Sequence, residues 1–250
     1  MGAGIEGVMK ARTRIAAIAI AVACTGLAYC WSLRTPNFLP ADSNAFVAQF
    51  APPPASDSPQ TRAELDELLS LQAQRTPAET AAARADRKKD VRQFYGALGI
   101  DAASGATLTP LRNLTQHIET DVSLYVRDAK HRFVRQRPYV IEARLKPCID
   151  DVSDNESYPS GHATYGYVIA LVLAEMVPER RAALLARADE FGHHRMTCGV
   201  HFASDVAAGR AGAEWLVREL DKGADYRAAR SKAAESLRAA LKLPPVPPGS

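Results

Sequence analysis

Apolar side chains recur at intervals of three and four residues along most of the chain, which is the spacing of a helix buried on one face. The longest such pattern follows Thr109 and Pro110, a pair typical of an N-cap and a first helical turn. Its apolar positions are Leu111, Leu114, Ile118, Val122, Tyr125, Val126 and Ala129. No stretch alternates between apolar and polar residues for long enough to predict a strand. The pattern therefore predicts an all-α protein.

Further helices are predicted downstream of this one. Their ranges are 160–176, 179–194, 204–220 and 224–243. Pro178 separates the first two of them, because proline ends one helix yet is tolerated in the first turn of the next. Together with the residues before it, this pattern predicts one helical domain over residues 61–243, followed by a proline-rich tail at 244–250.

Residues 29–60 are rich in proline, serine and alanine, which predicts an extended arm. The arm carries Phe38, Phe46 and Phe50. We expect these rings to hold it against the core, because a freely flexible linker has little use for large apolar side chains.

The first 28 residues resemble an export signal. The basic residues Lys10, Arg12 and Arg14 precede the uncharged run 15–28. A run of about 14 residues is short for a membrane span and suits a signal peptide, with cleavage expected after Ala23 or Ala28. Two alternatives are an uncleaved anchor extending to Leu33 and a lipoprotein signal. The protein is therefore expected in the periplasm or secreted, and at a membrane only if this segment is retained.

Charge and cysteine content narrow the possible partners. The 250 residues include 31 Lys and Arg against 28 Asp and Glu, and a net charge of +3 is too small to suggest nucleic-acid binding. Exported proteins meet an oxidising compartment, where paired cysteines form disulfides. Cys148 and Cys198 are the two cysteines of the predicted folded body, so we expect them to be bonded to each other. The alternative is two buried free thiols.

A first candidate cluster is Lys130, Arg137 and Pro138, close to the end of a basic helix. Two cations seven residues apart lie about two helical turns apart on one face, a spacing that can hold one small anion from two sides. The alternative is a solvated helix end whose charge complements the helix dipole.

A second cluster is the sequence Pro159-Ser160-Gly161-His162, just before an apolar helix. Ser160 suits an N-cap, and Gly161 allows close approach of the backbone. A helix N-terminus that also offers a hydroxyl and an imidazole is an anion-binding arrangement. The alternative is an ordinary capped helix with an exposed histidine.

A third cluster is Arg195, His201 and Asp205. An aspartate four residues after a histidine can accept the imidazole Nδ1–H, which leaves Nε2 unprotonated and nucleophilic. The alternative is a local hydrogen bond at a helix start. His193, His194 and His201 could also be imagined as metal ligands with Asp205, but their spacing matches no familiar metal motif. We therefore predict no metal and no cofactor.

In combination, the patterns K-x6-RP, PSGH and R-x5-H-x3-D resemble the signature of the phosphatidic acid phosphatase type 2 (PAP2) superfamily, which includes vanadium haloperoxidases. Residues 125–220 resemble more narrowly the class A bacterial non-specific acid phosphatases. In one departure, this chain has His194 where the family usually has serine. The resemblance implies a compact helical bundle and a homo-oligomer, dimer or larger.

The resemblance also implies a broad-range acid phosphatase for small phosphate monoesters that needs no metal. In it, His201 would form a phosphohistidine, Asp205 would hold His201, and His162 would be the general acid and base. The implied phosphate-binding residues are Lys130, Arg137, Ser160, Gly161 and Arg195. Alternatives are a phosphatase for a lipid phosphate or diphosphate, a vanadate-dependent haloperoxidase and an exported phosphate-binding protein. Because one histidine must be neutral while the other is protonated, we expect an acidic pH optimum.

Overall fold

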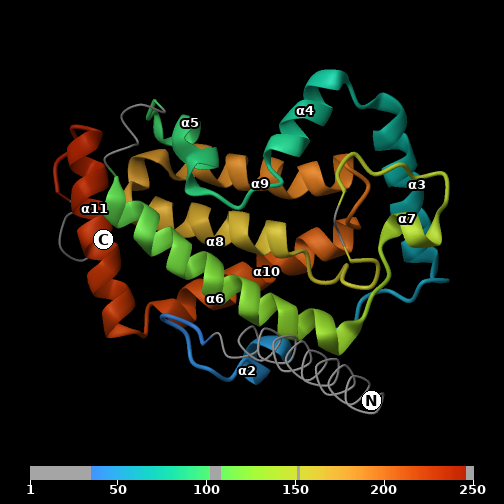
Figure 1. Cartoon of the computed structure of the whole chain (residues 1–250), viewed down its shortest axis with the longest axis horizontal. Coiled ribbons are helices and arrows are strands. Elements are labelled where there is room, and N and C mark those ends of the chain that lie inside the picture. The colour runs from blue at the N-terminus through green and yellow to red at the C-terminus, as the bar shows by residue number, and fades with distance from the viewer. Residues whose placement is uncertain (1–34, 102–107, 151–152, 246–250) are drawn as a thin grey trace, which may run out of the picture. The chain divides into compact units, whose positions relative to one another are not determined.

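The computed structural model describes residues 35–101, 108–150 and 153–245 (Figure 1). The chain divides into two units, residues 1–35 and 36–250, and every element described below belongs to the second. The predicted export signal, the first residues of the arm and most of the tail lie outside the described residues. Export therefore stays a prediction.

Within the described ranges the regular structure is entirely helical, which confirms the predicted all-α class. The elements are α2 (Asn44–Val47), α3 (Pro59–Gln74), α4 (Pro77–Ala85), η1 (Val91–Phe94), α5 (Tyr95–Leu98), α6 (Thr109–Phe133), α7 (Pro138–Ile141), α8 (Gly161–Met176), η3 (Pro178–Arg180), α9 (Arg181–Thr197), α10 (Ala203–Leu220) and α11 (Ala224–Ala240). None of the helices in these ranges combines the length and the apolar character that a membrane crossing requires.

Helix α8 lies at the centre of the helical domain, with α6, α9 and α10 packed around it (Figure 1). Its side chains are apolar on nearly every face, and nearly all of them are buried, as expected for a helix surrounded by other helices. The core therefore forms around α8, and the N-terminus of α8 is held rigidly between its neighbours.

Helix α6 differs from its prediction at both ends. Thr109 is its first helical residue and not its N-cap, and the N-cap position, Leu108, makes no side-chain cap hydrogen bond. The helix ends at Phe133, because Val134 adopts a left-handed backbone conformation with φ of 46°. Lys130 and Arg137 therefore do not lie on one continuous helix, as the sequence interpretation assumed.

The C-terminal helices also shift slightly from their predicted bounds. Residues 178–180 form a separate 3-10 turn, and α9 continues to Thr197 instead of stopping near residue 194. Helix α11 ends at Ala240, a few residues early, because Lys242 has a positive φ of 56°. These shifts leave the order and packing of the helices unchanged.

The described part of the arm is attached to the helical domain by side chains of α6 and α10. The buried carboxylate of Asp121 accepts hydrogen bonds from the backbone N–H groups of Asn37, Phe38 and Leu39 at 2.6 to 3.1 Å. The Phe46 ring is fully buried and packs against Tyr125 and Trp215, with ring centroids 5.6 Å away in each case. The arm therefore forms part of the core.

Candidate active site

One cavity of about 270 Å³ collects residues from all three sequence clusters. The predicted site residues that line it are Lys130, Arg137, Gly161, His162, Arg195 and His201. Asp205 lies behind His201, and Ser160 is fully buried at the N-cap of α8. Segments that are far apart in the sequence thus meet at the N-termini of α8 and α10.

His201 is positioned by the start of α10. Its Nδ1 lies 3.2 Å from Oδ2 of Asp205, and that same oxygen accepts the backbone N–H of Phe202 at 2.9 Å. Because a carboxylate can only accept, Nδ1 carries the proton and Nε2 has the lone pair, which is the tautomer that the sequence predicted. Nε2 in turn accepts from Arg137 Nη1 at 2.6 Å. The two predicted site residues His201 and Arg137 are therefore in direct contact.

Asp205 belongs to a buried network that the sequence motifs do not include. Its Oδ1 accepts from Arg135 Nη1 at 2.7 Å, and Ser157 donates to Oδ2. Arg135 also reaches Glu64 Oε2 at 3.2 Å, and its guanidinium lies 3.9 Å from the centroid of the Phe202 ring. Arg135 could have been noticed in the sequence as a second arginine next to the RP motif. Nothing in the sequence pattern pointed to Glu64.

The N-terminus of α8 is placed by contacts with α10. Ser160 caps α8 by accepting from the Ala163 N–H at 3.3 Å, and its own N–H donates to the backbone oxygen of Asp205 at 3.0 Å. Gly209 of α10 faces this turn so closely that a Cβ there would lie 2.8 Å from the Ser160 carbonyl oxygen. Glycine at position 209 is therefore required for α10 to approach the start of α8.

The three predicted phosphate-binding cations are buried or partly buried at the cavity. Burial, assisted by the nearby Arg137, lowers the pKa of Lys130 to about 7, and burial lowers the pKa of Arg195 to about 10. Burial also lowers the pKa of Arg137. Arg195 is 1% exposed, and its Nε and Nη2 atoms have no hydrogen-bond partner among the described residues. A buried guanidinium in this state is poised to bind an anion.

His162 is held by the segment that follows α4. Its Nε2 lies 2.9 Å from the carbonyl oxygen of Arg87. Because a carbonyl oxygen can only accept, Nε2 carries a proton and donates it, and Nδ1 is the nitrogen that gains or loses a proton. Arg195 Nη1 reaches the neighbouring carbonyl of Asp86 at 3.3 Å. Two backbone carbonyls of one segment thus orient one predicted acid and one predicted cation.

This segment is anchored through the Asp86 side chain, which is 1% exposed. Its carboxylate accepts from His194 Nδ1 at 2.6 Å and forms an ion pair with Arg187. Burial alone would raise the pKa of Asp86, but the hydrogen bonds from His194 and Arg187 outweigh it and hold that pKa below its ordinary value. His194, the departure from the family pattern, therefore anchors the segment that contacts His162 and Arg195.

Both histidines of the cavity have a pKa well below the ordinary value. Burial is the largest cause in each case. The positive charges of Arg195 and Lys89 lower the pKa of His162 further, and those of Arg137 and Lys130 act on His201 in the same way. An anion bound among these cations would offset their effect.

Lys89 also lines the cavity and lies outside all three motifs. Its Nζ donates to Ser123 Oγ at 2.7 Å and lies 3.3 Å from Glu119 Oε1, both on α6. The signal available in the sequence was the basic run around it, which by itself is typical of a solvated surface.

The predicted disulfide is present between Cys148 and Cys198. It joins the loop after α7 to the C-terminal end of α9, close to Arg195 and His201, across a sequence separation of 50 residues. Closing a loop of that length stabilises the fold by about 4 kcal/mol in the chain-entropy model.

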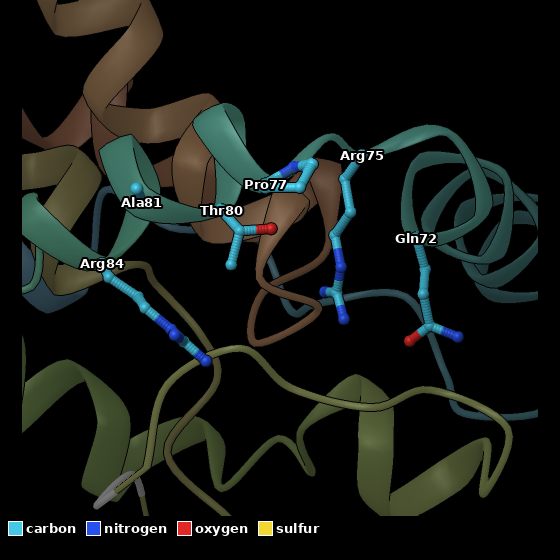
Figure 2. A pocket seen from close by; sticks show the side chains of 6 residues that line it. All are labelled: Gln72, Arg75, Pro77, Thr80, Ala81 and Arg84. Atoms are coloured by element: carbon cyan, nitrogen blue, oxygen red, sulfur yellow. The ribbon is translucent and has the colours of Figure 1, made fainter.

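A separate hollow of about 550 Å³ lies along α3 and α4 (Figure 2). Its long polar side chains hydrogen-bond to backbone carbonyls: Arg75 reaches Thr197 at 3.0 Å and Lys146 at 2.9 Å, and Arg84 reaches Cys148 at 2.8 Å. These side chains hold the disulfide loop in place, so the hollow is a structural contact region outside the motif cavity. Within the described ranges, no group of three or more His, Cys, Asp or Glu side chains could hold a metal ion.

A family model described as the PAP2 superfamily matches residues 114–217, which run from α6 to α10 and contain all three motifs. Residues 114–217 are therefore similar to the PAP2 superfamily. A bacterial vanadium-dependent iodoperoxidase has a similar structure, with a TM-score of 0.57 and 20% sequence identity over 72% of this chain and 54% of that one. That likeness shows that the helical domain has the same fold.

The chain also resembles proteins named as acid phosphatases. A non-specific acid phosphatase of Providencia stuartii is 37% identical over 126 residues, which are 49% of this chain and 50% of that protein. An acid phosphatase of Zymomonas mobilis is 28% identical over 222 residues, which are 84% of each chain. The match with the higher sequence identity thus spans half of the Providencia protein, and the match with the lower identity spans most of the Zymomonas protein.

Proposed function

We propose that the protein is a phosphoric monoester hydrolase of the acid phosphatase type, which acts through a phosphohistidine at His201. The observation that carries the proposal is the pairing of two features in one cavity. One is an imidazole whose Nδ1–H is held by Asp205, and the other is the buried guanidinium of Arg195, with two nitrogen atoms unpaired among the described residues. The names of the similar proteins support the same class of reaction.

In the first step, the lone pair on His201 Nε2 attacks phosphorus and the bond from phosphorus to the ester oxygen breaks. Arg137 donates to that lone pair at 2.6 Å, so a phosphoryl oxygen must take over the Arg137 hydrogen bond before attack. Lys130, Arg195 and the N-terminus of α8 would hold the remaining phosphoryl oxygens. Charge on those oxygens is stabilised most by fixed donors in a site that excludes water.

His162 would supply the proton that the departing alkoxide needs. Because Nε2 is bonded to the Arg87 carbonyl, the proton transferred is the one on Nδ1 of the imidazolium. In the second step, Nδ1 takes a proton from water as the water oxygen attacks phosphorus. The phosphorus–nitrogen bond then breaks, which releases phosphate and restores His201.

The test is hydrolysis by the purified protein of p-nitrophenyl phosphate, sugar phosphates, nucleotides and a lipid phosphate, each assayed with and without EDTA. We expect release of phosphate from several monoesters at acidic pH, with the rates unchanged by the chelator. A protein that binds phosphate yet hydrolyses none of these esters would overturn the proposal in favour of a phosphate-binding protein. Loss of activity in EDTA, restored by a divalent cation, would overturn metal independence.

The same proposal places the enzyme outside the cytoplasm, where the Cys148–Cys198 disulfide would persist. Expression of the full chain in a bacterium, followed by separation of periplasm, membrane and cytoplasm, tests this. Activity in the periplasm or medium supports cleavage of residues 1–28, activity in the membrane supports a retained anchor, and activity confined to the cytoplasm contradicts export.

A further inference from the structure

Lys89 lies between two cavities. It lines the motif cavity, and it also lines a second cavity of about 520 Å³. The other residues around the second cavity are mainly polar: Asp90, Arg92, Arg112, Asn113, Thr115, Gln116 and Glu119, together with Val91 and Tyr165. A substrate that extends past Lys89 would therefore meet amide and guanidinium groups and little apolar surface.

The two cavities follow each other along one face of α6. Ser123, Arg127 and Lys130 line the motif cavity, and Arg112, Gln116 and Glu119 line the second one. These positions are spaced by three or four residues, so they form one stripe along the helix. With a rise of 1.5 Å per residue, Glu119 and Lys130 are about 16 Å apart along the axis. That is within the reach of a sugar phosphate or a nucleotide extended by long side chains.

The charge on the motif cavity exceeds what one phosphate monoester needs. Its described lining contains five cationic side chains and one carboxylate, that of Glu156. The proposed mechanism uses Lys130, Arg137 and Arg195 on the reacting phosphoryl group, which is a dianion when fully ionised. Two cations, Lys89 and Arg127, are therefore in excess, and Lys89 also lines the second cavity.

The carboxylates that pair with these two cations bind them weakly compared with an incoming anionic group. Lys89 pairs with Glu119 at 3.3 Å and Arg127 with Asp128 at 3.3 Å, and both carboxylates are about one-third exposed, at 34% and 38%. Partly exposed ion pairs of this kind contribute little free energy. An anionic group on a substrate, held in place by the bound phosphoryl group, can replace either carboxylate.

We propose that Lys89 and Arg127 form a second anion site for the leaving group, so that the preferred substrates are polar monoesters carrying a second phosphate, such as sugar bisphosphates. This inference rests on the proposed function, since it concerns the leaving group of that reaction.

The test compares two substrates that differ by one phosphate, fructose 1,6-bisphosphate and fructose 6-phosphate. We expect the wild-type protein to have the higher kcat/KM on the bisphosphate. Lys89→Gln and Arg127→Gln should each lower the ratio of the two kcat/KM values by about tenfold, mainly through KM, because a charge-assisted hydrogen bond to the second phosphate is lost. The matched control is Arg132→Gln, which removes an exposed arginine of α6 that lines neither cavity.

The outcomes separate this inference from the proposed function. If the wild-type protein hydrolyses neither sugar phosphate nor any other monoester, the proposed function fails. If it hydrolyses both sugar phosphates without preference, or if Lys89→Gln slows both equally, only the second anion site is overturned. An equal change of the ratio in Arg132→Gln would assign the preference to the general positive field of α6 and would also overturn the site.

Discussion

The two histidines of the cavity are held in different ways. His201 is fixed by buried side-chain charges: Asp205 contacts it at 3.2 Å, Arg135 contacts Asp205 at 2.7 Å, and Glu64 contacts Arg135 at 3.2 Å. His162 is hydrogen-bonded to one backbone carbonyl, that of Arg87, and its ring stacks on the buried Phe191 ring with centroids 6.0 Å apart. That carbonyl belongs to a segment whose own anchor, Asp86, depends on side chains of α9 that are partly exposed.

This difference matches the two chemical tasks proposed. A nucleophile attacks along one direction, so a rigid support lowers the cost of reaching the transition state. A general acid must follow a leaving group that changes from substrate to substrate, and a loop carbonyl allows small adjustments. The His201 side is thus built for preorganisation, while the His162 side tolerates variety.

We expect the largest effect when each of the two histidines is replaced in turn. We expect His201→Ala to lower kcat on p-nitrophenyl phosphate by about 10⁴-fold or more, because the nucleophile is lost. His162→Ala should lower kcat by about 10²- to 10⁴-fold, because only proton transfer is lost. p-Nitrophenolate leaves without a proton, so His162→Ala should show a burst of product and a base-stable, acid-labile phosphoprotein. A burst in His201→Ala, or none in His162→Ala, would reverse the assigned roles.

The next effect concerns the buried support of His201. Arg135→Met leaves the carboxylates of Glu64 and Asp205 buried without their cation, which should destabilise the fold by about 3–5 kcal/mol. The control is Arg144→Met, which breaks an exposed pair with Glu142 and should change stability by less than about 1 kcal/mol. Denaturant unfolding of both variants measures the difference. Equal stability would mean that the network is dispensable for folding.

The His201 side is also the part of the site that the sequence predicted well. The i,i+4 spacing of His201 and Asp205 at a helix start fixes their contact by local geometry alone, and Ser160 before an apolar helix predicts its own capping bond. The positions of the central helices followed from the same periodicity. The end of α6 did not, because Val134 takes a left-handed conformation that its side chain does not favour.

The contacts of His162 could not be predicted from the sequence. The Arg87 carbonyl is separated from His162 by 75 residues and is a backbone group, which leaves no trace in residue types. Asp86 and His194 are 108 residues apart, and either alone suits an exposed helix position. Long-range contacts of this kind depend on the packing of α4 against α9, which periodicity does not encode.

The pH dependence of kcat/KM and kcat should follow the protonation of His162 more than that of His201. The lowered pKa of His201 keeps the nucleophile neutral at mildly acidic pH, whereas the lowered pKa of His162 reduces the protonated acid as pH rises. On an alkyl phosphate, whose leaving group needs a proton, we therefore expect kcat/KM to fall by about tenfold per pH unit above the free-enzyme pKa of His162. A bound phosphoryl dianion offsets Arg195 and Lys89, so kcat should fall at higher pH than kcat/KM. Profiles from pH 4 to 9 measure both, and a kcat/KM that rises steadily to pH 9 would contradict the assignment.

The smallest expected effect concerns the anchor of the His162 segment. His194→Ser removes the 2.6 Å contact with Asp86, because the shorter side chain does not reach the carboxylate, and leaves Arg187 as the other partner of Asp86. We expect kcat/KM to fall by about threefold on an alkyl phosphate and less on p-nitrophenyl phosphate, since a misplaced acid matters only when the leaving group needs a proton. Asp86→Asn should have the same signature with a larger loss, about tenfold, because the ion pair with Arg187 goes too.

His193→Ser is the matched control for these two variants, because His193 is the exposed neighbour on α9 and should leave both substrates unaffected. Equal losses on both substrates in His194→Ser would indicate general loosening of the fold. A loss confined to the alkyl phosphate identifies His194 and Asp86 as positioning residues for the general acid. That outcome would also give a role to His194, at the position where the family resemblance led us to expect serine: it holds the segment that orients His162, at a distance from the phosphoryl group.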